Sequence, residues 1–349
     1  MTFTQIGYGL GLLLVVPLAD LFENRRLIVT ILFVLFLALI GAAFAPSASL
    51  FFAVSLLVGL SSVAVQVIVP FAGHLASDAT RGRVVGSVTS GLFFGIMLAR
   101  PAASFVAHSF GWRPLYAFSA AMTAMIAAML LRVLPQRQPH SGLKYIDILR
   151  SLLPLVKTTP ILRRRAIYHM ALFAAFSLFW TAVPLLLASA PYHLTQVGIG
   201  LFSLAGAAGA IAAPLAGNAA DKGWTRALTC IALLAVVLSF GIGLFGEKNG
   251  SIPLLVIAAI VLDMGVSANL ILGQRAIFAL GPEIRSRLNG LFMASLFVAG
   301  AGGSALAGLT FAKGGWTATS VTGAAFAIAA FLYYLSEPGV IRAGASEKI

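Results

Sequence analysis

Long apolar segments separated by short polar ones recur along the whole chain. A helix needs about 20 residues to cross the hydrocarbon core of a bilayer, and the apolar segments reach or approach that length. They lack the alternation of polar and apolar positions that strands of a membrane barrel show. The pattern predicts eleven membrane-spanning helices: Ile6–Ala19, Leu27–Ala45, Leu50–Ala72, Val84–Ala107, Pro114–Leu134, Ala166–Ala188, Gln196–Ala219, Ala227–Phe245, Ile252–Gln274, Leu288–Ala312 and Ala318–Leu335.

Composition supports an all-α polytopic membrane protein. Of the 349 residues, 60% are hydrophobic and 9% are charged, whereas soluble domains carry about 25% charged residues. A soluble protein of this length would lack the polar surface to cover itself, so we expect the lipid bilayer as its partner. The net charge of +13 could suggest nucleic acid. The basic residues, however, form short clusters between apolar segments, which argues against a nucleic-acid partner.

The basic residues also predict the orientation of the chain. Alternate loops hold 19 of the 23 Lys and Arg residues, and the other set of loops holds only Arg113, Lys248 and Lys313. Basic loops stay in the cytoplasm, so we expect a multi-pass protein of a bacterial-type cytoplasmic (inner) membrane. Its C-terminus would be cytoplasmic and Met1 would lie on the other side.

One long polar stretch divides the predicted helices into five and six. We expect an N-terminal bundle over residues 1–134, a cytoplasmic linker over 135–165, a C-terminal bundle over 166–336 and a cytoplasmic tail over 337–349. Within the linker, Leu143–Val156 is basic and amphipathic, which is typical of a helix lying along a membrane surface.

The two halves repeat each other. Arg81-Gly82-Arg83 matches Arg285-Ser286-Arg287, and Gly111-Trp112 matches Gly315-Trp316, both at an offset of 204. Chance similarity between Ala/Gly-rich helices is the alternative, but chance would not readily keep these motifs in register. Matching loops lie on the same side, so the repeat is parallel, as in known transporters.

The repeat also exposes a gap in the first half. Two predicted helices precede Asp221, whereas only one precedes Asp20, which lies 201 residues earlier. We therefore expect a six-plus-six design whose first helix is missing from this sequence, through a misassigned start or a truncation.

The loops resemble those of the major facilitator superfamily, in particular its bacterial drug:proton-antiporter-like efflux branch. That family carries a loop signature that reads approximately G-x-L-A-D-R-x-G-R-R. Here Val16 replaces the first glycine and Glu23 the second. The matching residues are Leu18, Ala19, Asp20 and Arg25 in the first half, and Gly217, Ala220, Asp221, Lys222 and Arg226 in the second.

The resemblance implies a two-bundle fold with alternating access to a central site. It also implies gating loops, formed here by Asp20, Arg25, Arg26, Asp221, Lys222 and Arg226; the alternative is that the acids are ordinary solvated loop residues. Two departures bear on proton antiport. Leu50–Ala72 holds Gln66 but no arginine, and Arg100 stands where the fifth-helix signature has a proline.

Ionisable residues within predicted spans are costly in lipid and therefore mark functional sites. Asp263 and Arg100 are such residues, and a buried carboxylate is what a proton-coupled carrier needs. The alternative is a structural pairing of Asp263 with Arg100 or with a helix-end dipole. Further candidates for contact with substrate are Gln66, Asn269, Gln274 and Trp180, although each could instead serve helix packing. We expect His169, near the cytoplasmic end of its span, to be interfacial.

The sequence predicts a secondary transporter rather than an enzyme. It lacks the H-E-x-x-H, G-x-S-x-G and Walker signatures, and we expect no cofactor and no metal. Without an ATP-binding motif, active transport must use an ion gradient, and proton-coupled efflux of a small organic solute is the leading hypothesis. The alternatives are a facilitator or importer, an inactive truncated transporter and, less favoured, a polytopic membrane enzyme. We expect a monomer.

Overall fold

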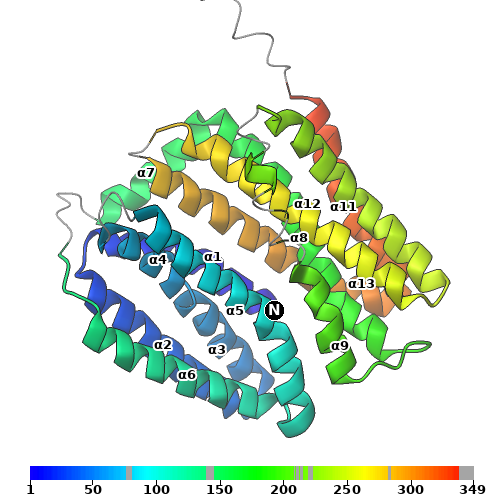
Figure 1. Ribbon diagram of the computed structural model, residues 1–349, viewed down its shortest axis with the longest axis horizontal. Helices are drawn as coiled ribbons and strands as arrows, with labels where there is room; N and C mark the ends of the chain where they lie inside the picture. Colours follow the sequence, from blue (N-terminus) through cyan, green and yellow to red (C-terminus); the bar gives the residue numbers. More distant parts are fainter. Residues whose placement is uncertain are drawn as a thin grey trace, which may run out of the picture.

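A computed structural model shows two groups of helices side by side (Figure 1). The structure describes residues 1–75, 81–138, 145–207, 209, 212, 215–218, 223–281 and 284–337. Every regular element in this part of the chain is helical, because backbone groups in lipid must be satisfied within each segment. Eight helices there are long and apolar enough to cross a membrane. The total of eleven and the additional first helix stay predictions.

The first half follows the predicted spans, with Ile6–Ala19 divided into an α-helix and a short 3-10 helix and one further break. Its elements are α1 (Thr2–Leu14), the short 3-10 helix η1 (Val16–Asp20), α2 (Asn24–Ala43), α3 (Ala48–Ser61), α4 (Ala64–Leu75), α5 (Arg81–Phe110) and α6 (Trp112–Val133). The single span expected over Leu50–Ala72 is divided into α3 and α4. The Ser61 and Ser62 hydroxyls bond back to the carbonyls of Leu57 and Val58 at this break, a contact that competes with the helix ladder.

The linker and the second half follow in the same order as expected. The elements are α7 (Tyr145–Thr158), α8 (Pro160–Ala188), α9 (Gln196–Phe202), η2 (Ser203–Ala207), α11 (Thr225–Lys248), α12 (Ile252–Phe278) and α13 (Arg285–Leu335). The linker thus contains the expected amphipathic helix as α7, while its place along the membrane surface stays a prediction. So do the domain boundaries.

The repeated Gly-Trp pairs have the same backbone geometry. Gly111 has φ 84° and ψ 174°, and Gly315 has φ 59° and ψ −150°, a region that only glycine occupies readily. Trp112 begins α6 after the first of them. At the second, non-helical angles at Gly314 and Gly315 divide α13 into the two predicted spans. The sequence repeat is therefore also a structural repeat.

Helices pack mainly within each half. In the first half α1 lies against α3 and α2 against α6, and in the second α8 lies against α13 and α11 against α12. The largest core cluster surrounds α8, where Leu178, Phe179 and Leu187 are fully buried. Two seams join the halves: α1 meets α13, and α5 meets α9 and η2.

Glycines set the closest helix crossings. A Cβ on Gly7 of α1 or on Gly59 of α3 would lie 2.0 Å from a backbone oxygen of the other helix. A Cβ on Gly303 of α13 would lie 2.1 Å from the carbonyl oxygen of Ala174 in α8. Small residues let membrane helices approach this closely, so these positions fix the spacing inside each half.

Candidate functional site

A cavity of about 260 Å³, named the central cavity here, is lined almost wholly by residues of the second half. Its wall is mostly apolar and comes from α8, η2, α12 and α13, with Ile96 of α5 as the contribution of the first half. Its lining side chains include His169, Phe173, Phe176, Asp263, Leu270 and Phe297. An apolar cavity with few polar groups is the usual form of a small-molecule site.

Asp263 supplies the carboxylate of this cavity. It lies in α12 and is 6% exposed, and its Oδ2 accepts a hydrogen bond of 2.9 Å from the indole Nε1 of Trp180 in α8. The bond holds the carboxylate against α8. The sequence therefore found two residues that the fold brings together, although it did not predict their contact.

The second polar group of the cavity is His169, which the sequence interpretation placed at the membrane interface. That interpretation is wrong, because His169 is 1% exposed and lines the cavity. Its Nδ1 lies 3.1 Å from the Nδ2 atom of Asn269, which is itself buried. Asn269, a predicted site residue, thus reaches the cavity through this imidazole. The sequence did carry a signal for this position of His169. Its spacing from Phe173, Phe176 and Trp180 places all four side chains on one face of the helix.

The remaining candidates lie elsewhere. Gln66 donates a 3.1 Å hydrogen bond to the Tyr8 hydroxyl and faces a different pocket, described below. Gln274 donates to Oδ1 of Asn289 at 3.2 Å, which joins α12 to α13. The backbone of Arg100 lies in α5, but its side chain is outside the described part of the structure, so its expected pairing with Asp263 stays a prediction.

The halves are in direct contact on the side away from the basic loops. Gln5 of α1 donates a 3.0 Å hydrogen bond to the Ser177 hydroxyl of α8. Gly200 of α9 lies so close to α5 that an added Cβ would be 2.7 Å from the Cβ of Ser104. The central cavity is therefore bounded by cross-half contacts at this end.

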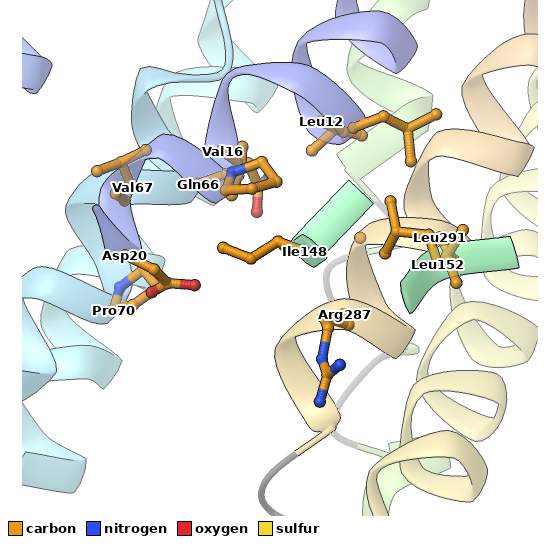
Figure 2. A pocket seen from close by; sticks show the side chains of 14 residues that line it. Leu12, Val16, Asp20, Gln66, Val67, Pro70, Ile148, Leu152, Arg287 and Leu291 are labelled. Atoms are coloured by element: carbon orange, nitrogen blue, oxygen red, sulfur yellow. The ribbon is translucent and has the colours of Figure 1, made fainter. Parts of the chain in front are cut away.

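On the basic side, a second pocket of about 90 Å³ separates the halves. Figure 2 shows Asp20 and Val16 on one wall, Arg287 and Leu291 on the other, and Ile148 of the linker helix α7 between them. Gln66 lines the same pocket. Asp20, a predicted gating residue, therefore faces the seam between the halves.

The linker helix α7 touches both sides of this seam. The Tyr145 hydroxyl donates a 2.7 Å hydrogen bond to the carbonyl of Leu14 in the first half. In the second half, Arg287 donates to the Ser151 hydroxyl at 3.0 Å. Ile148 lies about one helical turn from both Tyr145 and Ser151 and is 5% exposed. Any movement that widens or closes this side must therefore alter contacts of α7.

Glu23, which replaces a glycine of the family signature, organises the first basic loop. Its carboxylate accepts hydrogen bonds of 2.9 Å from the backbone N–H groups of Arg25 and Arg26, and so caps α2. Burial of the carboxyl opposes ionisation, but the N–H groups of Arg26, Arg25 and Arg137 hold the pKa of Glu23 below its usual range. Of the predicted gating residues, Arg25 and Arg26 thus supply backbone donors to this cap.

The second basic loop is described only in part. Asp221 and Lys222 lie outside the described residues. Arg226 donates a 3.5 Å hydrogen bond to the carbonyl of Glu337, and Glu337 also lies 3.8 Å from Arg165. Arg226 therefore joins the start of α11 to the end of α13 within the second half.

Relatives of the chain are transporters. It is 39% identical over 334 residues to the uncharacterized transporter YgaY of Escherichia coli O157:H7, with 96% of this chain and 84% of YgaY covered. It is 28% identical over 314 residues to the probable transporter SCO4007 of Streptomyces coelicolor, with 89% of this chain and 72% of the relative covered.

Solved structures share the fold. A mutant of the nucleoside transporter NupG superposes with a TM-score of 0.71 at 16% identity, over 96% of this chain and 90% of NupG. The human organic anion transporter MFSD10 superposes with a TM-score of 0.65 at 18% identity, over 95% of this chain and 82% of that one. The family model of the Major Facilitator Superfamily matches residues 1–247 and 166–348. This chain is thus a multi-pass membrane protein that belongs to the Major Facilitator Superfamily of transporters.

Proposed function

We propose that this protein exports a small organic solute in exchange for protons, by alternating access to the central cavity. The observation that carries the proposal is Asp263, a carboxylate in the wall of an apolar cavity and in a helix long and apolar enough to span a membrane. An ionisable group there is costly to insert, at about 2.5–3.5 kcal/mol. Its presence is understandable if it binds and releases a proton during each transport cycle.

The arrangement of the halves supports alternating access. Direct contacts such as Gln5 to Ser177 close one side, while Asp20 and Arg287 face each other across a pocket on the basic side. The proposal takes the basic side as cytoplasmic, in a bacterial-type inner membrane. If contacts such as Gln5 to Ser177 break and the pocket between Asp20 and Arg287 closes, the cavity becomes accessible from the opposite side of the membrane.

The test is Asp263→Asn in proteoliposomes, with ethidium as the transported probe and a pH-sensitive dye to report protons. We expect the wild-type protein to move ethidium against its gradient when a pH gradient is applied. The variant should lose this coupling because an amide cannot exchange a proton, while its melting temperature in detergent stays close to that of the wild type.

Asp147→Asn is the matched control, since Asp147 lies exposed on α7 and away from the cavity. It should leave coupling unchanged. If Asp263→Asn retains full coupling, Asp263 has no part in proton exchange. Ethidium flux that only equilibrates, with no response to the pH gradient in the wild type, would indicate a facilitator instead.

A further inference from the structure

Four side chains of α8 form a continuous stripe beside the central cavity. His169, Phe173, Phe176 and Trp180 follow one another at spacings of four, three and four residues, which places them on one helix face. Neighbouring ring centroids are 6.1, 5.4 and 6.4 Å apart, and Phe173 and Phe176 are nearly parallel at 16°. The first three of these residues line the cavity.

Each end of the stripe is bonded to α12. At one end the Trp180 indole donates to Asp263, and at the other Asn269 bonds to His169. Asp263 and Asn269 are six residues apart, which is about 9 Å along a helix. The cavity therefore has a polar group at each end, Asp263 and His169, with the apolar rings of Phe173 and Phe176 between them.

The bond to Asn269 favours one tautomer of the imidazole. When Nδ2 of Asn269 donates, as amide nitrogens do, Nδ1 of His169 accepts and Nε2 carries the ring proton. The ring is held between Phe292, whose centroid is 5.6 Å away at 27°, and Phe173. His169 is thus a neutral donor in the wall of the cavity, with a fixed orientation.

Two glycines make room for these rings. A Cβ on Gly300 would lie 2.7 Å from ring atoms of Phe173, and a Cβ on Gly273 would lie 2.8 Å from the ring of Phe292. From a second wall, Phe297 meets Phe173 edge to face at 5.3 Å and 70°. The aromatic surface is therefore rigid before any ligand arrives, which lowers the entropy cost of binding.

We propose that the part of the α8 stripe that lines the cavity (His169, Phe173 and Phe176) is the substrate-binding surface, that the substrate is a planar aromatic solute, and that His169 selects it through a hydrogen bond to an acceptor. The inference rests on the proposed transport function but needs only binding to be tested. A flat ring system stacks on Phe173 and Phe176, and a carbonyl or similar acceptor faces the Nε2–H of His169.

The experiment compares three probes of matched shape with the full chain in lipid nanodiscs, using empty nanodiscs to subtract partition into lipid. 2-Acetylnaphthalene is flat and carries an acceptor, 2-ethylnaphthalene is flat without one, and 2-acetyldecalin carries the acceptor on a saturated ring. We expect the wild type to bind 2-acetylnaphthalene about tenfold more tightly than either of the others, the effect of one well-placed contact.

His169→Phe should remove the preference for 2-acetylnaphthalene over 2-ethylnaphthalene and leave the affinity for 2-ethylnaphthalene unchanged. His169→Gln keeps an acceptor for Asn269 and a donor for the ligand, and should restore part of the preference. Phe176→Leu should weaken both naphthalenes about tenfold. Phe179→Leu is the matched control, because Phe179 is buried on another face of α8 against Phe240 and Trp316.

The proposal is overturned if both His169 variants keep the wild-type preference, if Phe176→Leu and Phe179→Leu bind alike, or if 2-acetyldecalin binds as tightly as 2-acetylnaphthalene. Selective binding together with ethidium flux that does not respond to the pH gradient would instead refute the proposed proton coupling and leave the binding surface intact.

Discussion

Replacing either glycine of the repeated Gly-Trp pair with alanine should destabilise the protein through its backbone alone. Gly111 and Gly315 both have positive φ with ψ near ±150–180°, where a Cβ costs about 1–3 kcal/mol. A Cβ added at either position meets no atom of a more distant residue within 4 Å, so a clash with the rest of the fold contributes nothing. The cost of Gly111→Ala or Gly315→Ala is therefore the strain of the local backbone conformation alone.

The assay is the apparent melting temperature of the purified protein in detergent. At roughly 2 °C per kcal/mol for a chain of this size, we expect each variant to melt about 2–6 °C below the wild type. Gly302→Ala and Gly308→Ala are the controls, since these glycines lie in helical backbone of α13 and an added Cβ also meets no atom within 4 Å. They should melt at or slightly above the wild-type temperature.

The reasoning is refuted if Gly111→Ala and Gly315→Ala melt like these controls. Alanine would then be tolerated at the Gly-Trp pairs, and the positive φ angles would not explain why glycine is repeated at these two positions. A loss at only one of the two positions would show that the halves have diverged there.

Three further predictions test packing, charge and the linker. Gly303→Ala should lower the melting temperature well below that of its neighbour Gly302→Ala, because its Cβ would meet the Ala174 carbonyl at 2.1 Å; equal melting would contradict the close crossing. Ionised Glu23 stabilises the fold above pH about 4.5, and this contribution is lost as the pH falls through its lowered folded pKa. Glu23→Gln should therefore lower the melting temperature more at pH 7 than at pH 3, and an equal loss at both values would assign the effect to packing. Removing the hydroxyls that join α7 to both halves, with Tyr145→Phe and Ser151→Ala together, should speed thiol labelling of Leu12→Cys in a Cys230→Ser background, whereas an unchanged rate would show that α7 does not restrict the seam.

The predicted spans, the repeat and the choice of Asp263 came from the sequence because the bilayer imposes simple rules. A spanning segment must be apolar, of a set length and helical, and a buried carboxylate is too costly to occur without a reason. The Gly-Trp pairs were visible as letters at a fixed offset, and the structure adds that both glycines share one backbone conformation.

What the sequence left undecided is which way each helix faces. The sequence predicts an interfacial position for His169 and a substrate contact for Gln66, whereas His169 lines the cavity and Gln66 faces the basic-side pocket. Lipid tails and the protein interior are about equally apolar, so a membrane helix that is hydrophobic all round does not reveal its inner face. Only the packing of α8 against α12 and α13 brought His169 to Asn269 and Trp180 to Asp263, and with them the chemistry of the cavity.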